Sequence, residues 1–142
     1  MANDSQRAGL EAYIKLFNRL EQGCEGLEAC VTEDVHFSDP FHQLEGRQPL
    51  ADYLAFFARQ VETPRFRIRY RGWDGDVCLL RWQFSGQLRG QPWSFPGVSE
   101  LHFTEDGKVR AHIDHWDAAS HFYQRLPLLG SLIRLIARRL KP

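Results

Sequence analysis

Apolar residues near the start of the chain recur every three or four positions, which is the period of an α-helix. This first pattern consists of Leu10, Tyr13, Ile14, Phe17 and Leu20. It predicts a helix over residues 5–20, and a short second helix is expected over residues 24–30. A third helix is predicted where Pro49 lies near the first turn and apolar residues follow at the same spacing, namely Leu50, Tyr53, Leu54, Phe57 and Val61.

After Pro64 apolar residues alternate with polar ones, which is the period of a strand that buries one face. The dipeptides Asp74-Gly75 and Asp106-Gly107 are typical of hairpin turns between such strands. Helical spacing returns from residue 118, with a break at Pro127. The predicted strands cover residues 35–38, 66–71, 77–88, 93–103 and 108–117.

Strands joined by consecutive hairpins form an antiparallel sheet, and helices grouped on one face of it give an α+β fold. Long strands must twist and bend, and Gly86, Pro96 and Gly97 lie inside them where kinks are expected. We therefore predict a strongly bent, mainly antiparallel sheet that is wrapped round helices and forms a cone with an internal pocket. One domain is expected, with its body in residues 1–126 and a C-terminal helix in residues 127–142.

Composition and charge narrow the class of protein. The 142 residues, 43% hydrophobic and 25% charged, are typical of one globular domain. The 18 basic and 18 acidic residues cancel, which argues against a nucleic-acid-binding protein. No apolar run reaches the roughly 18 residues of a membrane span and the start of the chain is polar, so a cytoplasmic protein is expected. The 3 cysteines lack a metal-binding spacing and are expected to be free thiols.

Several short motifs follow one another in a set order along the chain. They are Tyr13-Ile14-x-Leu16, Asp39-Pro40-Phe41, Gly46-Arg47, Phe103-x-x-Asp106-Gly107 and Trp116. Together they resemble the SnoaL-like and ketosteroid isomerase-like branch of the nuclear transport factor 2-like superfamily. The resemblance implies a cofactor-independent isomerase, cyclase or lyase that moves a proton on a small apolar carbonyl compound, which would be polyketide-, steroid- or lipid-like. It equally admits a non-catalytic module that binds a small ligand or dimerises, because one fold hosts both.

Asp39 is the first candidate catalytic residue. Taken alone, Asp-Pro is common turn chemistry in which the carboxylate accepts local backbone hydrogen bonds. The resemblance implies instead a general base at the mouth of the cone. Tyr13 is the second candidate: alone it is a core aromatic residue of a helix, whereas the resemblance implies a donor to a developing oxyanion. A third isomerase position, an Asp in that family, holds Ser99 here, which argues against steroid isomerase activity itself.

The last predicted strand supplies the third catalytic candidate, Asp114. If Trp116 points into the cone, strand alternation places His112 and Asp114 on the same side. The SnoaL-like resemblance implies a working Asp on this strand, acting with Asp39 or in its place. The open alternative is a buried carboxylate paired with Arg110, with His112 or with another chain. One His and one Asp on that side do not make the three ligands of a catalytic metal site, so neither a metal nor a cofactor is expected.

Aromatic residues on the inward faces of these elements predict the lining of the pocket. Packed core is the alternative for residues of this kind, and His42 is either at the rim or in an exposed loop. A lining of aromatic rings suits an uncharged small apolar molecule. The predicted substrate-binding residues are Phe17, Phe37, His42, Tyr53, Phe57, Trp82, Phe84, Phe95, Ser99, His112 and Trp116.

Two further surfaces are expected to meet a partner. Val109, Ala111 and Ile113 form an apolar stripe on the outer face of the sheet, so a homodimer through this face is expected. Residues 127–142 form a basic amphipathic helix that is either laid on the apolar core as a lid or dimer element, or lies on a membrane surface. Its apolar stripe is Leu128, Leu132, Ile136 and Leu140, with Arg134, Arg138 and Lys141 opposite.

Overall fold

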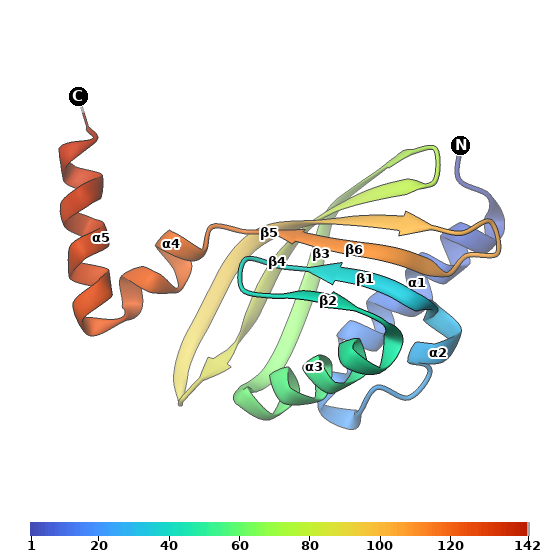
Figure 1. The fold of residues 1–142 in the computed structure, drawn as a ribbon, viewed down its shortest axis with the longest axis horizontal. Helices are drawn as coiled ribbons and strands as arrows, with labels where there is room; N and C mark the ends of the chain where they lie inside the picture. The colour runs from blue at the N-terminus through green and yellow to red at the C-terminus, as the bar shows by residue number, and fades with distance from the viewer. Residues whose placement is uncertain (142) are drawn as a thin grey trace.

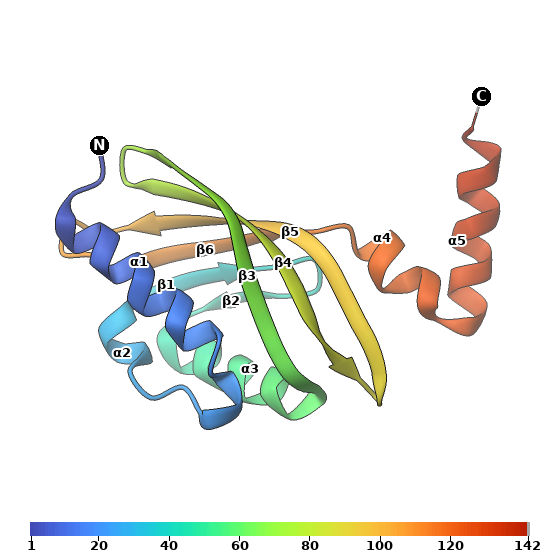
Figure 2. The same ribbon diagram turned by 180° about the vertical axis from the view of Figure 1, so that it is seen from behind.

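The computed structural model describes residues 1–141, which form one six-stranded sheet with helices on its concave side (Figures 1 and 2). The strand order is β2-β1-β6-β5-β4-β3. The strands are β1 Val31–Ser38, β2 Gln43–Glu45, β3 Val61–Asp74, β4 Val77–Leu88, β5 Gln91–Phe103 and β6 Val109–His115. The helices of the body are α1 Asp4–Phe17, α2 Leu27–Cys30 and α3 Arg47–Gln60, with a 3₁₀ turn, η1, at Leu20–Gln22. The predicted α+β fold is confirmed.

The sheet is mainly antiparallel and strongly curved. β3, β4, β5 and β6 pair as consecutive hairpins, whereas β1 lies parallel to β6. The register of β3 against β4 shifts between Glu62 and Arg65 and again between Ile68 and Tyr70. Such bulges bend a strand and increase its twist. Figures 1 and 2 show the result, in which the long strands curve at one end around the space beside α3.

Gly97 allows a close approach on the concave face. A Cβ atom at this position would lie 2.2 Å from the Trp82 ring, which is far inside normal contact. Gly97 and Trp82 are direct cross-strand partners on β5 and β4. The indole therefore lies flat against the β5 backbone, and this places its ring nitrogen beside the next inward residue of β5, Ser99.

The core fills the space between this concave face and helices α1 and α3. A capping box starts α1: the Asn3 side chain accepts from the Gln6 N–H, and the Gln6 side chain accepts from the Asn3 N–H. The helical spacing predicted for both helices places apolar side chains on the buried face. These buried side chains are Leu10, Tyr13 and Leu16 of α1 and Leu50 and Leu54 of α3.

Some predicted boundaries are wrong by a few residues. Val61 fits the helical spacing of α3, yet α3 ends at Gln60 and Val61 begins β3. Pro64 lies inside β3 rather than before it, because β3 is an edge strand and its register shifts there, so no ladder hydrogen bond is lost. The strand Gln43–Glu45 was not predicted, since three residues are too few to show an alternating pattern.

The expected outer-face position of Val109 is also wrong. His102 pairs with Ala111 and Phe103 pairs with Val109, so Arg110 is an extra residue on β6. This bulge reverses the alternation at the start of the strand, and Val109 is buried in the core. Ala111 and Ile113 keep the outward position and are half-buried.

The chain ends in a helical segment beyond the sheet. α4 covers Ala118–His121, a 3₁₀ turn, η2, covers Tyr123–Arg125, and α5 covers Pro127–Arg139. Figures 1 and 2 show α5 standing away from the sheet, at the end opposite the N-terminus. Pro142, the last residue of the predicted C-terminal segment, lies outside the described residues. No helix within residues 1–141 has the length and apolar content needed to cross a membrane.

Candidate active site

An aromatic cavity of about 200 Å³ lies between the concave face of the sheet and α3. All of the predicted substrate-binding residues except Ser99 and His112 line it. Rings from α1, α3, β1, β3, β4 and β5 contribute to the wall, as do Trp116 and Phe122 from the segment after β6. The predicted internal pocket is therefore present. The polar side chains in the wall are Asp39, His42, Tyr53, Gln60 and Asp114.

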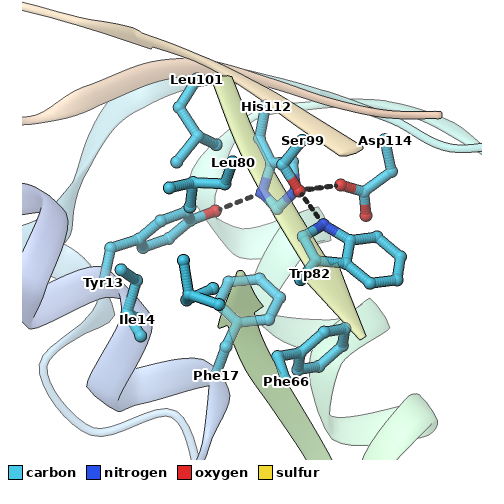
Figure 3. A pocket seen from close by; sticks show the side chains of 11 residues that line it. Tyr13, Ile14, Phe17, Phe66, Leu80, Trp82, Ser99, Leu101, His112 and Asp114 are labelled. Atoms are coloured by element: carbon cyan, nitrogen blue, oxygen red, sulfur yellow. Dashed lines mark hydrogen bonds and ion pairs between the residues drawn. The ribbon is translucent and has the colours of Figure 1, made fainter. Parts of the chain in front are cut away.

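A smaller hollow of about 40 Å³ lies deeper in the cone (Figure 3). Tyr13, Ser99 and His112 line this inner hollow and not the larger cavity. Asp114 lines both spaces and therefore stands at their boundary. Of the three predicted catalytic residues, the structure brings Asp39 and Asp114 to the larger cavity and leaves Tyr13 behind its wall.

A chain of hydrogen bonds converges on Asp114 (Figure 3). Tyr13 Oη lies 2.8 Å from His112 Nδ1, and His112 Nε2 lies 2.7 Å from Asp114 Oδ1. The Ser99 hydroxyl donates to the same Asp114 oxygen. Trp82 Nε1 donates to Ser99 Oγ over 2.9 Å. Among the partners considered for Asp114, the structure thus shows His112, and it adds Ser99.

The direction of each bond in this chain follows from what its members can donate. The indole N–H of Trp82 can only donate, so the Ser99 hydroxyl accepts a hydrogen bond from it. The Ser99 O–H in turn donates a hydrogen bond to Asp114. Burial, and then the negative charge of Asp114, raise the pKa of Tyr13 well above its usual value, so this phenol stays protonated. With the phenol donating to Nδ1, a neutral His112 carries its proton on Nε2 and donates to the carboxylate.

The strand register explains why these side chains meet. Ser99 of β5 is the direct cross-strand partner of Asp114 of β6, and Leu101 is the partner of His112. Alternation along β6 then places His112 and Asp114 on the concave side together. Asp114 Oδ1 receives two donors, while Oδ2 accepts no hydrogen bond from residues 1–141. The carboxylate is held in one orientation and keeps one oxygen available.

Asp39 is held in a different way, in the turn after β1. Its Oδ1 accepts the backbone N–H groups of Phe41 and His42, each over 2.8 Å, and lies 3.0 Å from His42 Nδ1. Its Oδ2 accepts the Tyr53 hydroxyl over 2.8 Å. Burial, and then the charge of Asp39, raise the pKa of Tyr53, so this phenol remains a donor. The Asp39 side chain is only 7% exposed, and the local turn bonds that Asp-Pro favours are present.

The two carboxylates are neighbours because β1 and β6 run parallel. Ser38 of β1 pairs with Ile113 of β6, so Asp39 and Asp114 are the next residues on adjacent strands. Adjacent strands lie about 4.8 Å apart. Asp39 and Asp114 also line a shallow hollow at the carboxyl ends of β1 and β6, together with Pro40. A pair of neighbouring carboxylates at the wall of an apolar cavity is suited to proton transfer.

Comparison with known proteins agrees with this architecture. The family model for the SnoaL-like domain matches residues 10–112. The chain belongs to the SnoaL-like domain family. No curated protein matches the chain.

The fold of this SnoaL-like domain is similar to that of solved structures described as NTF2-like, at 13% and 15% sequence identity. A crystal structure of TerC co-crystallised with polyporic acid has 18% identity and a TM-score of 0.72, over 92% of this chain and 99% of that one. A Mycobacterium tuberculosis LEH-like epoxide hydrolase has 18% identity and a TM-score of 0.70, over 94% and 96%. A putative SnoaL-like polyketide cyclase from Jannaschia sp. CCS1 has 14% identity and a TM-score of 0.69, over 84% and 92%. At such identities the likeness shows the fold alone.

The SnoaL-like domain also has wall residues that the sequence did not single out. Phe41 follows Asp39-Pro40, and its ring lies 5.1 Å from that of Phe122, centroid to centroid. Both line the cavity, and Phe122 comes from the segment after β6. Phe56 and Gln60 of α3 line it as well. Phe56 and Gln60 follow Tyr53 and Phe57 by three residues, so helical spacing was the signal available for them.

Proposed function

We propose that this protein is a cofactor-independent enzyme of the isomerase, cyclase or lyase type, acting by carboxylate proton transfer on a small apolar carbonyl compound. The observation that carries the proposal is Asp114, which lines an aromatic cavity with one oxygen held by two donors and the other without a hydrogen-bond donor among residues 1–141. A base needs its charge stabilised and an accessible lone pair, and Asp114 has both.

In the proposed reaction Asp114 Oδ2 removes a proton from the carbon next to the substrate carbonyl. His112 and Ser99 continue to hold Oδ1, so the carboxyl group keeps its orientation while it carries the proton. Tyr13 acts through His112, as a positioning residue. Tyr53 lines the cavity, and in this reaction its hydroxyl turns its single proton away from Asp39 Oδ2 and donates it in a hydrogen bond to the oxyanion that develops on the substrate. Asp114 then returns the same proton, either to the original carbon or to a second carbon of the substrate.

The cavity favours a flat or fatty substrate without charge. Its wall is mostly aromatic, and within residues 1–141 no Lys or Arg side chain lines it. A charged substrate would therefore lose its hydration without gaining an ionic partner. Polyketide-, steroid- and lipid-like carbonyl compounds fit this environment.

The alternative is a non-catalytic module that binds a small apolar ligand. One observation favours it: both oxygens of Asp39 are occupied by donors from its own turn and from Tyr53. A carboxylate in this state supports the loop and does not need to take part in chemistry.

Hydrogen–deuterium exchange separates these two functions. Ketones of the polyketide, steroid and fatty classes are incubated with the protein in D₂O, and deuterium at the carbon next to the carbonyl is followed by NMR. The enzyme proposal expects catalysed exchange that falls at least about 100-fold in Asp114→Asn. Quenching of the cavity tryptophans Trp82, Trp93 and Trp116 measures binding independently. Binding without exchange would support the binding module instead, whereas exchange that Asp114→Asn does not change would show that Asp114 is not the base.

A further inference from the structure

Helix α5 packs against the rest of the chain with its polar side. Gly130 is the buried residue within residues 127–139, and a Cβ there would lie 2.2 Å from the carbonyl oxygen of Gln124. Arg134 Nη1 donates to that same oxygen over 2.8 Å, and Arg134 Nη2 donates to Ser131. A small residue and a charged one thus contact η2, with the half-buried Ile133 beside them, whereas the leucines of the helix stay exposed.

The apolar side of α5 is consequently left in solvent. The helix has a clear apolar face, and its exposed fractions run from 39% at Leu129 to 88% at Leu128. Scattered exposed leucines are ordinary on a protein surface, but a continuous face of them marks a site of contact. The exposed members of this face are Leu128, Leu129, Leu132, Leu135, Ile136 and Leu140.

The charge of this segment has one sign. No Asp or Glu occurs after Asp117, whereas Arg134, Arg138, Arg139 and Lys141 are all exposed. Arg134, Arg138 and Lys141, together with Gln124, line a shallow hollow beside the helix. A face of leucines backed by basic side chains is the pattern of helices that lie in the interface of an anionic membrane, where lipid tails take the leucines and headgroups take the cations.

We propose that α5 binds the surface of an anionic lipid bilayer. A second copy of this chain is a poorer occupant of the same face. A helix of 13 residues is about 20 Å long, so pairing two of them buries well under the roughly 800 Å² per partner of a stable interface. Pairing would also bring two sets of basic side chains together, whereas an anionic surface attracts them.

The test is flotation of the 142-residue chain with vesicles. Vesicles of phosphatidylcholine mixed with an equal amount of phosphatidylglycerol are compared with vesicles of phosphatidylcholine alone, at low and at physiological salt. Binding is expected to the anionic vesicles and to weaken as salt rises. Leu132→Glu is expected to lower the partition coefficient at least about tenfold, because it replaces an inserted apolar side chain with a charge. Replacing Arg138 and Arg139 with glutamine is expected to lower the partition coefficient roughly fivefold for each charge removed.

Matched substitutions elsewhere separate this effect from a general loss of solubility. Leu79 on β4 is 51% exposed and Leu132 is 52% exposed, so Leu79→Glu is the control for Leu132→Glu. Arg67→Gln with Arg81→Gln, both exposed on the sheet, is the control for the double arginine variant. Neither control should change binding. Thermal melting checks that each variant is folded.

Three results would overturn the proposal. The first is failure of the wild-type chain to float with anionic vesicles. The second is equal binding by wild type and Leu132→Glu. The third is a lipid-free oligomer, seen by sedimentation equilibrium, that Leu132→Glu dissociates, which would assign the leucine face to a second copy of the chain.

Discussion

Replacing Tyr13 with Phe tests the buried hydrogen-bonded chain without disturbing the packing of the ring. The variant loses one hydroxyl group and leaves His112 Nδ1 without the partner that lies 2.8 Å away. His112 is buried, so water does not readily replace that partner. A buried polar group left unpaired costs about 1–3 kcal/mol. We therefore expect the free energy of unfolding to fall by this amount.

Urea denaturation followed by tryptophan fluorescence measures this change, and thermal melting gives a second reading. For a domain of this size a loss of 1 kcal/mol lowers Tm by about 3–4 °C, so a decrease of about 3–12 °C is expected. Tyr70→Phe is the matched control, because Tyr70 is 74% exposed and the same change there should alter stability by less than about 0.5 kcal/mol. Equal stability of the two variants would refute the argument that the buried Tyr13–His112 bond stabilises this hydrogen-bonded chain.

The remaining predictions concern packing and titration. Gly97→Ala should lower the free energy of unfolding by about 1–3 kcal/mol, since the new Cβ would overlap the Trp82 ring; unchanged urea denaturation would contradict that contact. Burial raises the pKa of Tyr13 and of Tyr53, so the stability that these phenols contribute is complete below the unfolded-state pKa of about 10 and is lost as the pH rises toward the folded-state values. In an alkaline titration of phenolate absorbance Tyr13 and Tyr53 should therefore ionise only as the chain unfolds, and their ionisation below the pH of unfolding, identified with Tyr13→Phe and Tyr53→Phe, would contradict this. Burial also raises the pKa of Cys78 to about 11, so a thiol reagent at mildly alkaline pH should modify Cys78 only after unfolding, with Cys78→Ser identifying its signal.

Hydrophobic periodicity predicted the elements that bury one continuous face. The observed bounds of β4 are those expected from the alternation over residues 77–88, because its inward side chains, Cys78 through Phe84, are all core residues. The alternating pattern gave a wrong prediction where one extra residue interrupts it. Arg110 is such a residue, and a single insertion in β6 moved Val109 from the expected outer face into the core.

The sequence predicted which residues belong to the candidate site, but it did not predict all of the hydrogen bonds between them. Alternation along the last strand correctly placed His112, Asp114 and Trp116 on one side. The pairing of Ser99 with Asp114 depends on the register between β5 and β6, which the bulge at Arg110 sets and which no local pattern reports. The bond from Tyr53 to Asp39 depends on how α3 is oriented against the turn after β1. Such contacts arise from tertiary packing and not from spacing along the chain.

The two neighbouring carboxylates are held by hydroxyl, backbone amide and imidazole groups and not by Lys or Arg side chains. Asp114 is held by Ser99 and His112, and Asp39 is held by two backbone amides and Tyr53, while no Lys or Arg within residues 1–141 lines the cavity. Oriented dipoles in a poorly solvated site stabilise charge strongly and bring no charge of their own. The cavity can therefore keep a basic carboxylate at its wall and remain apolar for its ligand. An arginine partner would have stabilised Asp114 as well, but it would also have weakened the carboxylate as a base and attracted anionic ligands. The donor set thus supports the uncharged substrate and the role of the accessible Asp114 oxygen that we propose.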